Sequence, residues 1–570
     1  MEAWFQDALT FNFTIPAPPD PEPIEITDLP LPPVTHNETE GGCTREINPR
    51  GTGCIGVKSS DLLSGSFLPD GDHITASVVF KGAPALPNSA SAFNGLHLII
   101  VRANGTTFPN GDPWKCITCG VPKNQQYGLT STMNYEYPQA FNDGTRILAG
   151  SYIIDCGTAQ LASAECTPQK IHIYPIRWNT SPDGNGSGGT IRELRKHPDD
   201  FNPTPKTGLP HTPRYDLVNV TLLHAPSGVP TFSTNGSHLS INIESITVGE
   251  ARGINSVGDQ ITYVGFPTES CNIDIFSVSL KTSKVVRVTS DPEYVDPIDK
   301  SPDDKWVAIM DSTTSHRMMF LAGMRGIPPL VDTLITSAIS SIRSNGGRGF
   351  FQPWLVDEYG ARYYEDGRYY QGQQINGEEK NDPLWNGGAD PRWSPDGTKI
   401  AYFQRLVTSP DCGDSNPLPC PNSTEPGQRR SRLMMATLTS RSAFPQLLSI
   451  PLGNFTLAGK FGGHAKVSFV PDSTGNTLKT VIATYHHVSD DGKSFIHGTE
   501  KVSATTPNVN SIHVDWFSDL RSSGISESSK ITSPGGFHFD IDIENNKFYA
   551  NGTLTTTVDG IHYRQPLNGT

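Results

Sequence analysis

Short apolar stretches that run into a Pro-Asp or Asn-Asp turn, followed by β-branched stretches with alternating polarity, recur along most of this 570-residue chain. An apolar strand, a tight turn and a returning alternating strand are the pattern of a β-hairpin. The alternation has the period of strands and not of helices, so the sequence predicts an all-β protein. Five copies of the pattern are visible, at 66–80, 137–151, 296–312, 390–403 and 467–484.

The spacing of the copies predicts a repeat architecture. Most copies start about 70 to 95 residues apart, and two further strands follow several of them, as in 96–106 and 273–290. Two hairpins per unit make a four-stranded antiparallel blade, and successive blades make a β-propeller. A gap of nearly 160 residues after 137 leaves room for another copy near 214–217, and 535–552 is a last candidate. We therefore expect seven blades, with six and eight as the alternatives.

The organisation outside the repeats is simpler. Residues 1–50 are rich in Pro and acidic residues, which predicts an extended stretch along the body and not a helix. The propeller is expected over 51–570, with a long Tyr-rich insertion near 345–385.

Composition excludes several classes of partner. The net charge is −14 and no large basic cluster is present, which argues against nucleic acids and anionic membranes. The sequence contains no apolar run long enough to cross a bilayer, no Gly-rich phosphate loop and no Gly-x-Ser-x-Gly elbow. We expect no cofactor and no metal, because Cys116 and Cys119 lack a second pair at zinc spacing.

The compartment is indicated by sequons and cysteines. Eleven Asn-x-Ser/Thr sequons predict N-linked glycans and a secreted, extracellular protein whose signal peptide has been removed. Nine cysteines fall into close pairs that predict loop disulfides, with the partner of Cys271 left open. The pairs are Cys43/Cys54, Cys116/Cys119, Cys156/Cys166 and Cys412/Cys420. The sequons are at Asn12, Asn37, Asn104, Asn179, Asn185, Asn219, Asn235, Asn422, Asn454, Asn551 and Asn568.

Two resemblances add to this interpretation. The stretches DIFSVSLKTSKVVRVTSDPEYVDPIDKSPDDKWVAIM and ADPRWSPDGTKIAYF resemble TolB-type propeller repeats, which implies the fold and little about activity. The combination of MRGIPPL (324–330), RGFFQPWLVDEYG (348–360) and NDPLWNGGADPRWSPDGTKIAYF (381–403) is similar to secreted fungal saponin hydrolases. That second resemblance runs from about residue 50 onward. It implies a glycosidase that cuts between a triterpenoid aglycone and a glucuronic-acid-headed oligosaccharide.

Candidate site residues come from aligning the repeats on their turns. Residues just before each innermost strand converge at one mouth of a propeller's central channel. Glycoside hydrolysis needs two carboxyl groups, for which Asp296 and Asp390 are the first candidates and Glu136 the third. Arg252 and Arg392 are candidates to bind a glucuronate. His464, His538 and Trp385 complete the predicted substrate-binding set, with Trp385 offered as aromatic surface for the aglycone.

Each of these residues also has a structural interpretation. An Asp before Pro commonly caps a turn, which applies to Asp296 and Asp390. The structural interpretation of the two histidines is that they are ordinary hydrogen-bonded residues, and that of Arg392 is stacking beside Trp393.

Two other functions stay open. A metal-dependent propeller lyase or lactonase would use His464, His538, His211 and either Gln352 or Gln139. A non-catalytic carbohydrate-binding propeller needs no such set. The choice between retention and inversion depends on the distance between the carboxyl groups, which the sequence does not give.

Overall fold

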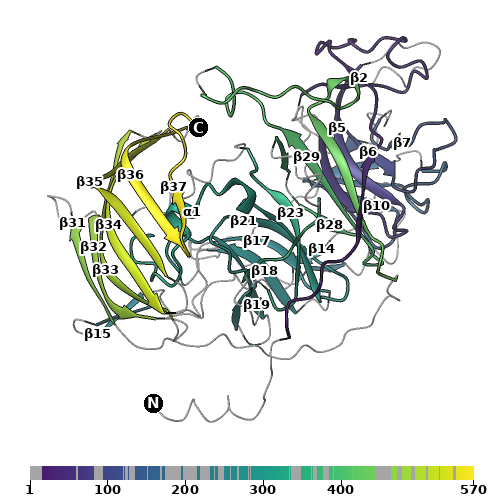
Figure 1. The fold of residues 1–570 in the computed structure, drawn as a ribbon. Helices are drawn as coiled ribbons and strands as arrows, with labels where there is room; N and C mark the ends of the chain where they lie inside the picture. The colour runs from purple at the N-terminus through teal and green to yellow at the C-terminus, as the bar shows by residue number, and fades with distance from the viewer. Residues whose placement is uncertain are drawn as a thin grey trace, which may run out of the picture.

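A computed structural model of the chain consists almost entirely of strands (Figure 1). Among the described residues the only α-helix is α1 (Met319–Ala322), and two 3-10 turns, η6 (Thr313–Ser315) and η7 (Pro426–Gln428), join strands. The structure describes residues 16–570 outside gaps at 59–61, 83–93, 120, 122–125, 128–134, 136, 151, 167–169, 174–193, 197–214, 218–231, 236–237, 242–248, 257–258, 266–268, 280–281, 283, 333, 335–347, 361, 364–368, 377–383, 389, 415, 443–463, 472–477, 490–493, 509–510, 525–526 and 543–546.

Six sheets of at least four strands are present in the described chain; the first five along the chain are blades, and each blade is named here by its innermost strand. The β4 blade contains β4 (Leu62–Phe67), β5 (His73–Lys81), β6 (Asn94–Arg102) and β7 (Trp114–Cys116), extended by β3 (Ile55–Gly56) and β2 (Val34–Thr35). The β9 blade contains β9 (Gln139–Ala140), β10 (Arg146–Ala149), β11 (Tyr152–Asp155), β12 (Lys170–Ile173) and β8 (Gln126–Tyr127). The β17 blade contains β17 (Gly249–Ile254), β18 (Gln260–Gly265), β19 (Asp274–Ser279) and β20 (Val285–Arg287).

The last two blades complete the series. The β21 blade contains β21 (Val295–Lys300), β22 (Trp306–Asp311), β23 (Gln352–Asp357) and β26 (Gln373–Gln374). The β28 blade contains β27 (Trp385–Gly387), β28 (Arg392–Trp393), β29 (Lys399–Leu406), β30 (Ser431–Leu438) and β1 (Ile24–Leu29). Three two-stranded pairs lie outside the blades: β13 (Leu194–Lys196) with β14 (Tyr215–Leu217), β15 (Phe232–Asn235) with β16 (His238–Ile241), and β24 (Arg362–Tyr363) with β25 (Tyr369–Tyr370).

The innermost strands contact one another in ring order. β17 contacts β21, β21 contacts β28, β28 contacts β4, and β4 contacts β9. The β4 blade comes first along the chain and the β28 blade last, so their contact brings the two ends of the series together. The β28 blade also takes its outer strand from the N-terminal region, because β1 pairs antiparallel with β30 from Ile24↔Leu438 to Leu29↔Leu433. Four-stranded sheets packed side by side in this order form a β-propeller.

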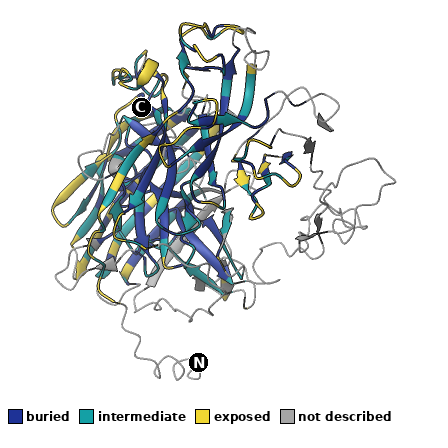
Figure 2. Cartoon of the chain, turned by 90° about the vertical axis from the view of Figure 1, so that its right-hand side faces the viewer, coloured by how far each residue is buried: buried dark blue, intermediate teal, exposed yellow. Residues whose placement is uncertain are grey.

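Hydrogen bonds within the turns and apolar packing between the blades stabilise these hairpins. In the β28 blade, the Ser394 hydroxyl and the Thr398 amide both donate to Asp396, at 2.6 and 3.1 Å, and this fixes the Pro-Asp-Gly turn. Asp303 accepts a hydrogen bond from Ser301 at 2.5 Å in the same way. The central strands of the blades, such as β5 and β29, are buried along most of their length, and neighbouring blades share apolar cores (Figure 2).

The C-terminal region corrects the predicted blade count. The hairpin at 467–484 and the strand at 535–552 are not blades but parts of one antiparallel sheet, in which each strand pairs with the next. Each of the seven strands pairs with the next one along the chain, so this sheet is larger than a four-stranded blade. The strands are β31 (His464–Pro471), β32 (Leu478–Val488), β33 (Ser494–Asn508), β34 (Ser511–Gly524), β35 (Ser528–Asp542), β36 (Lys547–Val558) and β37 (Ile561–Arg564).

One face of this C-terminal sheet packs against the propeller. Trp516 and Phe537 of the sheet share a hydrophobic core with Ile298 of β21 and Phe320 of α1. Figure 1 shows the sheet beside the blades, with α1 between them. Along β34 and β35 the residues of the opposite face are partly or fully exposed. The sheet therefore has one face toward the propeller and one toward solvent.

Two expected segments also differ in detail. The Pro-rich stretch 1–50 supplies β1, so part of it belongs to a blade. The Tyr-rich stretch 345–385 contains β23 and β26 of the β21 blade, and only the β24–β25 hairpin is inserted between them. The four predicted disulfides are confirmed, and Cys271 is a buried free cysteine. No helix in the described chain is long and apolar enough to cross a membrane.

Candidate functional site

Three neighbouring innermost strands carry charged side chains that form ion pairs with one another. Arg252 lies on β17, Asp296 and Asp299 lie on β21, and Arg392 lies on β28 two residues after Asp390. Contacts of β21 with β17 and with β28 place the three strands side by side. We call these five residues the inner-strand cluster.

Asp296 is held by two donors. Its carboxylate accepts a hydrogen bond from Arg252 at 2.5 Å and from the Tyr294 hydroxyl at 2.6 Å. The residue is only 5% exposed, so both contacts form away from bulk water. Both strands deviate from regular pairing here, β17 between Ala251 and Gly253 and β21 between Val295 and Ile298. Such bulges re-aim side chains, as active sites often require.

Asp299 and Asp390 share one guanidinium. Arg392 donates to Asp390 at 2.9 Å and lies 3.6 Å from the Asp299 carboxylate. The Trp393 amide also donates to Asp299, at 2.8 Å. Asp390 adopts a left-handed backbone with φ 61, a conformation that Asp tolerates better than most residues. The pair of carboxyl groups is thus fixed by one arginine and one backbone N–H.

Burial favours the protonated form of the Asp299 carboxyl group. Burial raises the pKa of Asp299 to about 6, against the lowering effect of Arg392 and the Trp393 amide, and the charge of Asp390 raises it further. The Asp299 side chain remains 28% exposed, so it is partly accessible to a ligand. An acid with a pKa near 6 can exchange its proton at mildly acidic pH, and Asp296 forms an ion pair with Arg252. The cluster can therefore supply a proton donor, a carboxylate and two guanidinium groups.

The structure brings together some of the predicted site residues. Arg252 contacts Asp296, and Arg392 contacts Asp390. Asp299 joins this group, because Arg392 lies between it and Asp390. Glu136 lies outside the described residues.

Three predicted binding residues are placed elsewhere. Trp385 is 2% exposed and lies beneath Arg432, whose guanidinium is 4.3 Å from the ring, so it offers no open surface to an aglycone. His464 and His538 belong to the C-terminal sheet and not to a blade, because the strands that carry them pair within that sheet. His538 bonds Asp515 at 2.5 Å on the solvent-facing side.

The residues proposed for a metal-dependent site do not come together in the described part of the chain. Gln352 is completely buried, donating to the Trp385 carbonyl and accepting from Asn376, both at 2.9 Å. Gln139 is exposed on β9, and His211 lies outside the described residues. Within the described residues, one group of three metal-ligating side chains is close enough to hold an ion: His97, Cys116 and Cys119. Its two cysteines form a disulfide.

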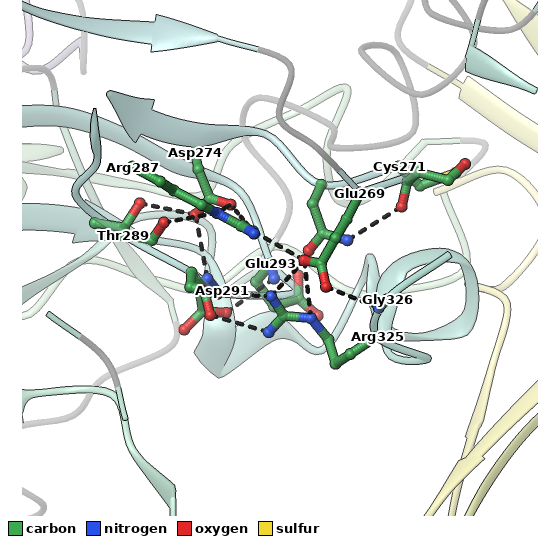
Figure 3. Close-up of polar contacts among 12 residues, drawn as sticks. Glu269, Cys271, Asp274, Arg287, Thr289, Asp291, Glu293, Arg325 and Gly326 are labelled. Atoms are coloured by element: carbon green, nitrogen blue, oxygen red, sulfur yellow. Dashed lines mark hydrogen bonds and ion pairs between the residues drawn. The ribbon is translucent and has the colours of Figure 1, made fainter. Parts of the chain in front are cut away.

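A second set of charges, which sequence reasoning missed, is enclosed between the β17 blade and the segment after α1 (Figure 3). Glu269 accepts hydrogen bonds from Arg325 at 2.6 Å, Arg287 at 2.9 Å and the Gly326 amide at 2.7 Å. Arg287 also binds Asp274 at 2.5 Å. Burial alone would raise the pKa of Glu269, but the two arginines hold it well below its usual range. All four charged groups have partners of opposite charge, so we interpret this network as a structural brace. Arg325 belongs to the MRGIPPL motif, and Asp274 and Arg287 belong to the TolB-like stretch that begins with DIFSVS.

A third group of polar residues lies where the C-terminal sheet meets the propeller, and we call it the seam cluster: Ser270, Cys271, Asp332, Glu500 and Lys530. Asp332 accepts hydrogen bonds from the Cys271 amide at 3.1 Å and from the Ser270 hydroxyl at 3.3 Å. Burial raises the pKa of Asp332 to about 7, against these donors and Lys530. The same burial raises the pKa of the Cys271 thiol, which makes it a poor nucleophile.

The raised pKa of Asp332 predicts a pH-dependent stability. Between its ordinary pKa of 3.8 and about 7, the folded protein keeps a proton that the unfolded chain releases. The free energy of unfolding contributed by Asp332 therefore falls as pH rises through that window and is constant above it. We expect Asp332→Asn, which cannot ionise, to gain stability relative to the wild type from about pH 4 to about pH 7. Urea unfolding of both proteins across this range measures the difference, and a difference independent of pH would contradict the assignment.

Comparisons with known proteins were made on the sequence and on the fold. No family model and no curated protein matches the chain. Similar solved structures include a putative TolB from Agrobacterium tumefaciens, with 15% identity, a TM-score of 0.21, and coverage of 67% of this chain and 90% of that one. TolB from Acinetobacter baumannii has 12% identity and a TM-score of 0.21, covering 65% of this chain and 54% of that one.

An oligogalacturonate lyase solved with manganese is also similar, with 11% identity, a TM-score of 0.17, and coverage of 52% of this chain and 75% of that one. Likenesses this weak assign neither a family nor an activity. The strand order and the contacts between innermost strands define this chain as an all-β propeller with a seven-stranded C-terminal sheet.

Proposed function

We propose that this protein is a secreted glycoside hydrolase that cleaves a glucuronic-acid-headed oligosaccharide from a triterpenoid aglycone at the inner-strand cluster. The observation that carries the proposal is the grouping of three carboxyl groups and two guanidinium groups on β17, β21 and β28. Asp299, with its pKa near 6, is suited to donate a proton to the glycosidic oxygen. Asp296 is suited to act as the second carboxylate, either activating water or attacking the anomeric carbon.

The arginines give the cluster its preference for an acidic sugar. A guanidinium binds a carboxylate with two parallel hydrogen bonds. Arg252 and Arg392 are 16% and 13% exposed at their side chains, and both already bind aspartates. A substrate glucuronate would compete with Asp390 for Arg392, and this exchange would release Asp390 for hydrogen bonds to sugar hydroxyls. The resemblance to saponin hydrolases supports the triterpenoid aglycone, and the described residues do not define its binding surface.

The test is product release from a saponin glucuronide, followed by chromatography and mass spectrometry. We expect free aglycone and an intact oligosaccharide carrying a new reducing end. Asp296→Asn should lower the rate by about 10²–10⁴-fold, as expected for an acid–base group. Asp396→Asn, which changes an acid in the neighbouring turn, is the matched control and should keep the wild-type rate. Intact substrate after long incubation with saturable binding would instead identify a carbohydrate-binding propeller.

Elimination is a second candidate, favoured by the contact of Asp296 with both Arg252 and Tyr294. A lyase acting on a uronate needs a cation beside the carboxylate and a base to remove the adjacent proton. Here Arg252 would be the cation and Asp296 the base, and Arg252 donates a hydrogen bond to Asp296 at 2.5 Å. The products distinguish the reactions, because elimination leaves an unsaturated sugar that absorbs ultraviolet light and hydrolysis does not. Loss of activity with a chelator, restored by Mn²⁺, would further favour a metal-dependent lyase.

A further inference from the structure

The solvent-facing side of the C-terminal sheet carries a sequon with an aromatic residue beside it. Tyr549, Asn551 and Thr553 alternate along β36, and side chains two residues apart on a strand point to the same face. Tyr549 is 43% exposed, and Asn551 and Thr553 are exposed. The neighbouring core-facing residue Phe548 is 1% exposed, which confirms that Tyr549 and Asn551 face outward.

The surroundings of Asn551 continue this surface. Asn551 lies directly opposite His538 on β35, and Phe517 of β34 packs edge-on against His538 at 5.7 Å between ring centroids. Phe517 is itself 37% exposed. Two exposed aromatic rings thus lie near one asparagine on an open sheet face.

We infer that Asn551 carries an N-linked glycan whose first sugar packs on the Tyr549 ring. The apolar C–H face of a sugar ring gains by covering an aromatic face, and the strand geometry places the attachment nitrogen beside that face. The Asn551 side chain is exposed, which leaves its amide available for modification. The inference depends on passage through the secretory pathway and not on the proposed catalytic activity.

The next sequon provides a contrast within the same sheet. Asn568 accepts a hydrogen bond from the Ala550 amide at 2.7 Å and donates one to the Ala550 carbonyl at 3.0 Å. The amide of a glycosylated asparagine is trans, so the sugar lies on the same side of the Cγ–Nδ2 bond as Oδ1. On Asn568 the sugar would therefore replace the Nδ2 hydrogen that is on the Oδ1 side. That hydrogen makes the bond to Ala550. Modification of Asn568 would break this pairing, so we infer that the folded protein leaves Asn568 unmodified.

The experiment is site-specific glycan analysis of the full chain secreted from a eukaryotic host, by peptide mapping after endoglycosidase digestion. We expect a sugar on Asn551 and none on Asn568. An unmodified Asn551, or Asn568 modified to the same extent, would overturn the assignment.

The contact with Tyr549 is tested by thermal unfolding of four proteins. Tyr549→Ala is compared in the glycosylated chain and in Thr553→Ala, which removes the sequon but keeps Asn551. We expect Tyr549→Ala to lower Tm by about 2 °C more when the glycan is present. The control is Asn104→Gln, which removes a sequon that has no aromatic residue beside it. Two positions before Asn104 the chain has Arg102, where the Asn551 sequon has Tyr549. An equal effect of Tyr549→Ala in both backgrounds would refute the sugar–aromatic contact.

Discussion

Replacing Lys530 by Met is expected to destabilise the protein by about 3–5 kcal/mol, the cost of leaving a buried charge without its partner. The Lys530 ammonium lies 3.0 Å from the Glu500 carboxylate, and both side chains are completely buried. It also lies 4.4 Å above the Trp516 ring, whose N–H donates to Glu500 at 2.9 Å. Burial alone would lower the pKa of Lys530, but Glu500 raises it above its usual range, so the ammonium keeps its proton.

The measurement is urea unfolding at neutral pH, followed by Trp fluorescence and by circular dichroism. The double variant Lys530→Met with Glu500→Gln is the control, because Gln keeps an acceptor for Trp516 and removes the stranded charge. We expect the double variant to recover most of the lost stability, since replacing both partners of a buried ion pair is often nearly neutral. Equal destabilisation by the single and the double variant would show that lost packing, and not the unpaired carboxylate, is the cause.

The location of this pair matters for how the two parts of the molecule unfold. Lys530 lies on the face of the sheet that packs against the propeller, and its charge acts on Asp332 and Cys271 of the segment opposite. Sheet and propeller also share one apolar core. We therefore expect both optical probes to report one transition in the wild type.

The sequence predicted the local parts of the fold well. The Pro-Asp turns form as expected, with Asp396 and Asp303 as turn caps, and the disulfides join the predicted close pairs. These features depend on residues within about ten positions of one another, which a sequence shows directly. The β17 blade was not predicted as a separate copy because its hairpin lacks the Pro-Asp turn. Asn255 closes that turn instead, accepting from the Asp259 and Gln260 amides.

The error in blade count concerns how successive hairpins combine into sheets. A hairpin at 467–484 has the same local pattern whether it belongs to a four-stranded blade or to a seven-stranded sheet. Only the further pairing of β32 with β33 and of β34 with β35 separates the two, and no turn residue encodes it. The same limit applies to the site. Asp296 and Arg252 could be placed on neighbouring strands, but the bulge that re-aims Asp296 and the burial that raises the pKa of Asp299 are tertiary effects.

Asp299→Asn is expected to have the largest effect on activity, a loss of about 10²–10⁴-fold in kcat/KM on a saponin glucuronide. A general acid must be protonated to act, and the pKa of Asp299 is about 6. The wild-type rate should therefore fall as pH rises through about 6, and this limb should vanish from the residual rate of the variant. Asn keeps an oxygen that can accept from the Trp393 amide, so the local backbone contact is preserved.

The pH profile separates a catalytic role from a structural one. A variant that merely perturbs the β28 blade would lower the rate by a constant factor and keep the limb near pH 6. Arg392→Lys offers a second check, because it keeps the positive charge beside Asp299 and loses the two-pronged contact with a glucuronate. It should raise KM more than it lowers kcat. If Asp299→Asn retains the full rate and an unchanged pH profile, the proton donor is another residue and the assignment of the inner-strand cluster fails.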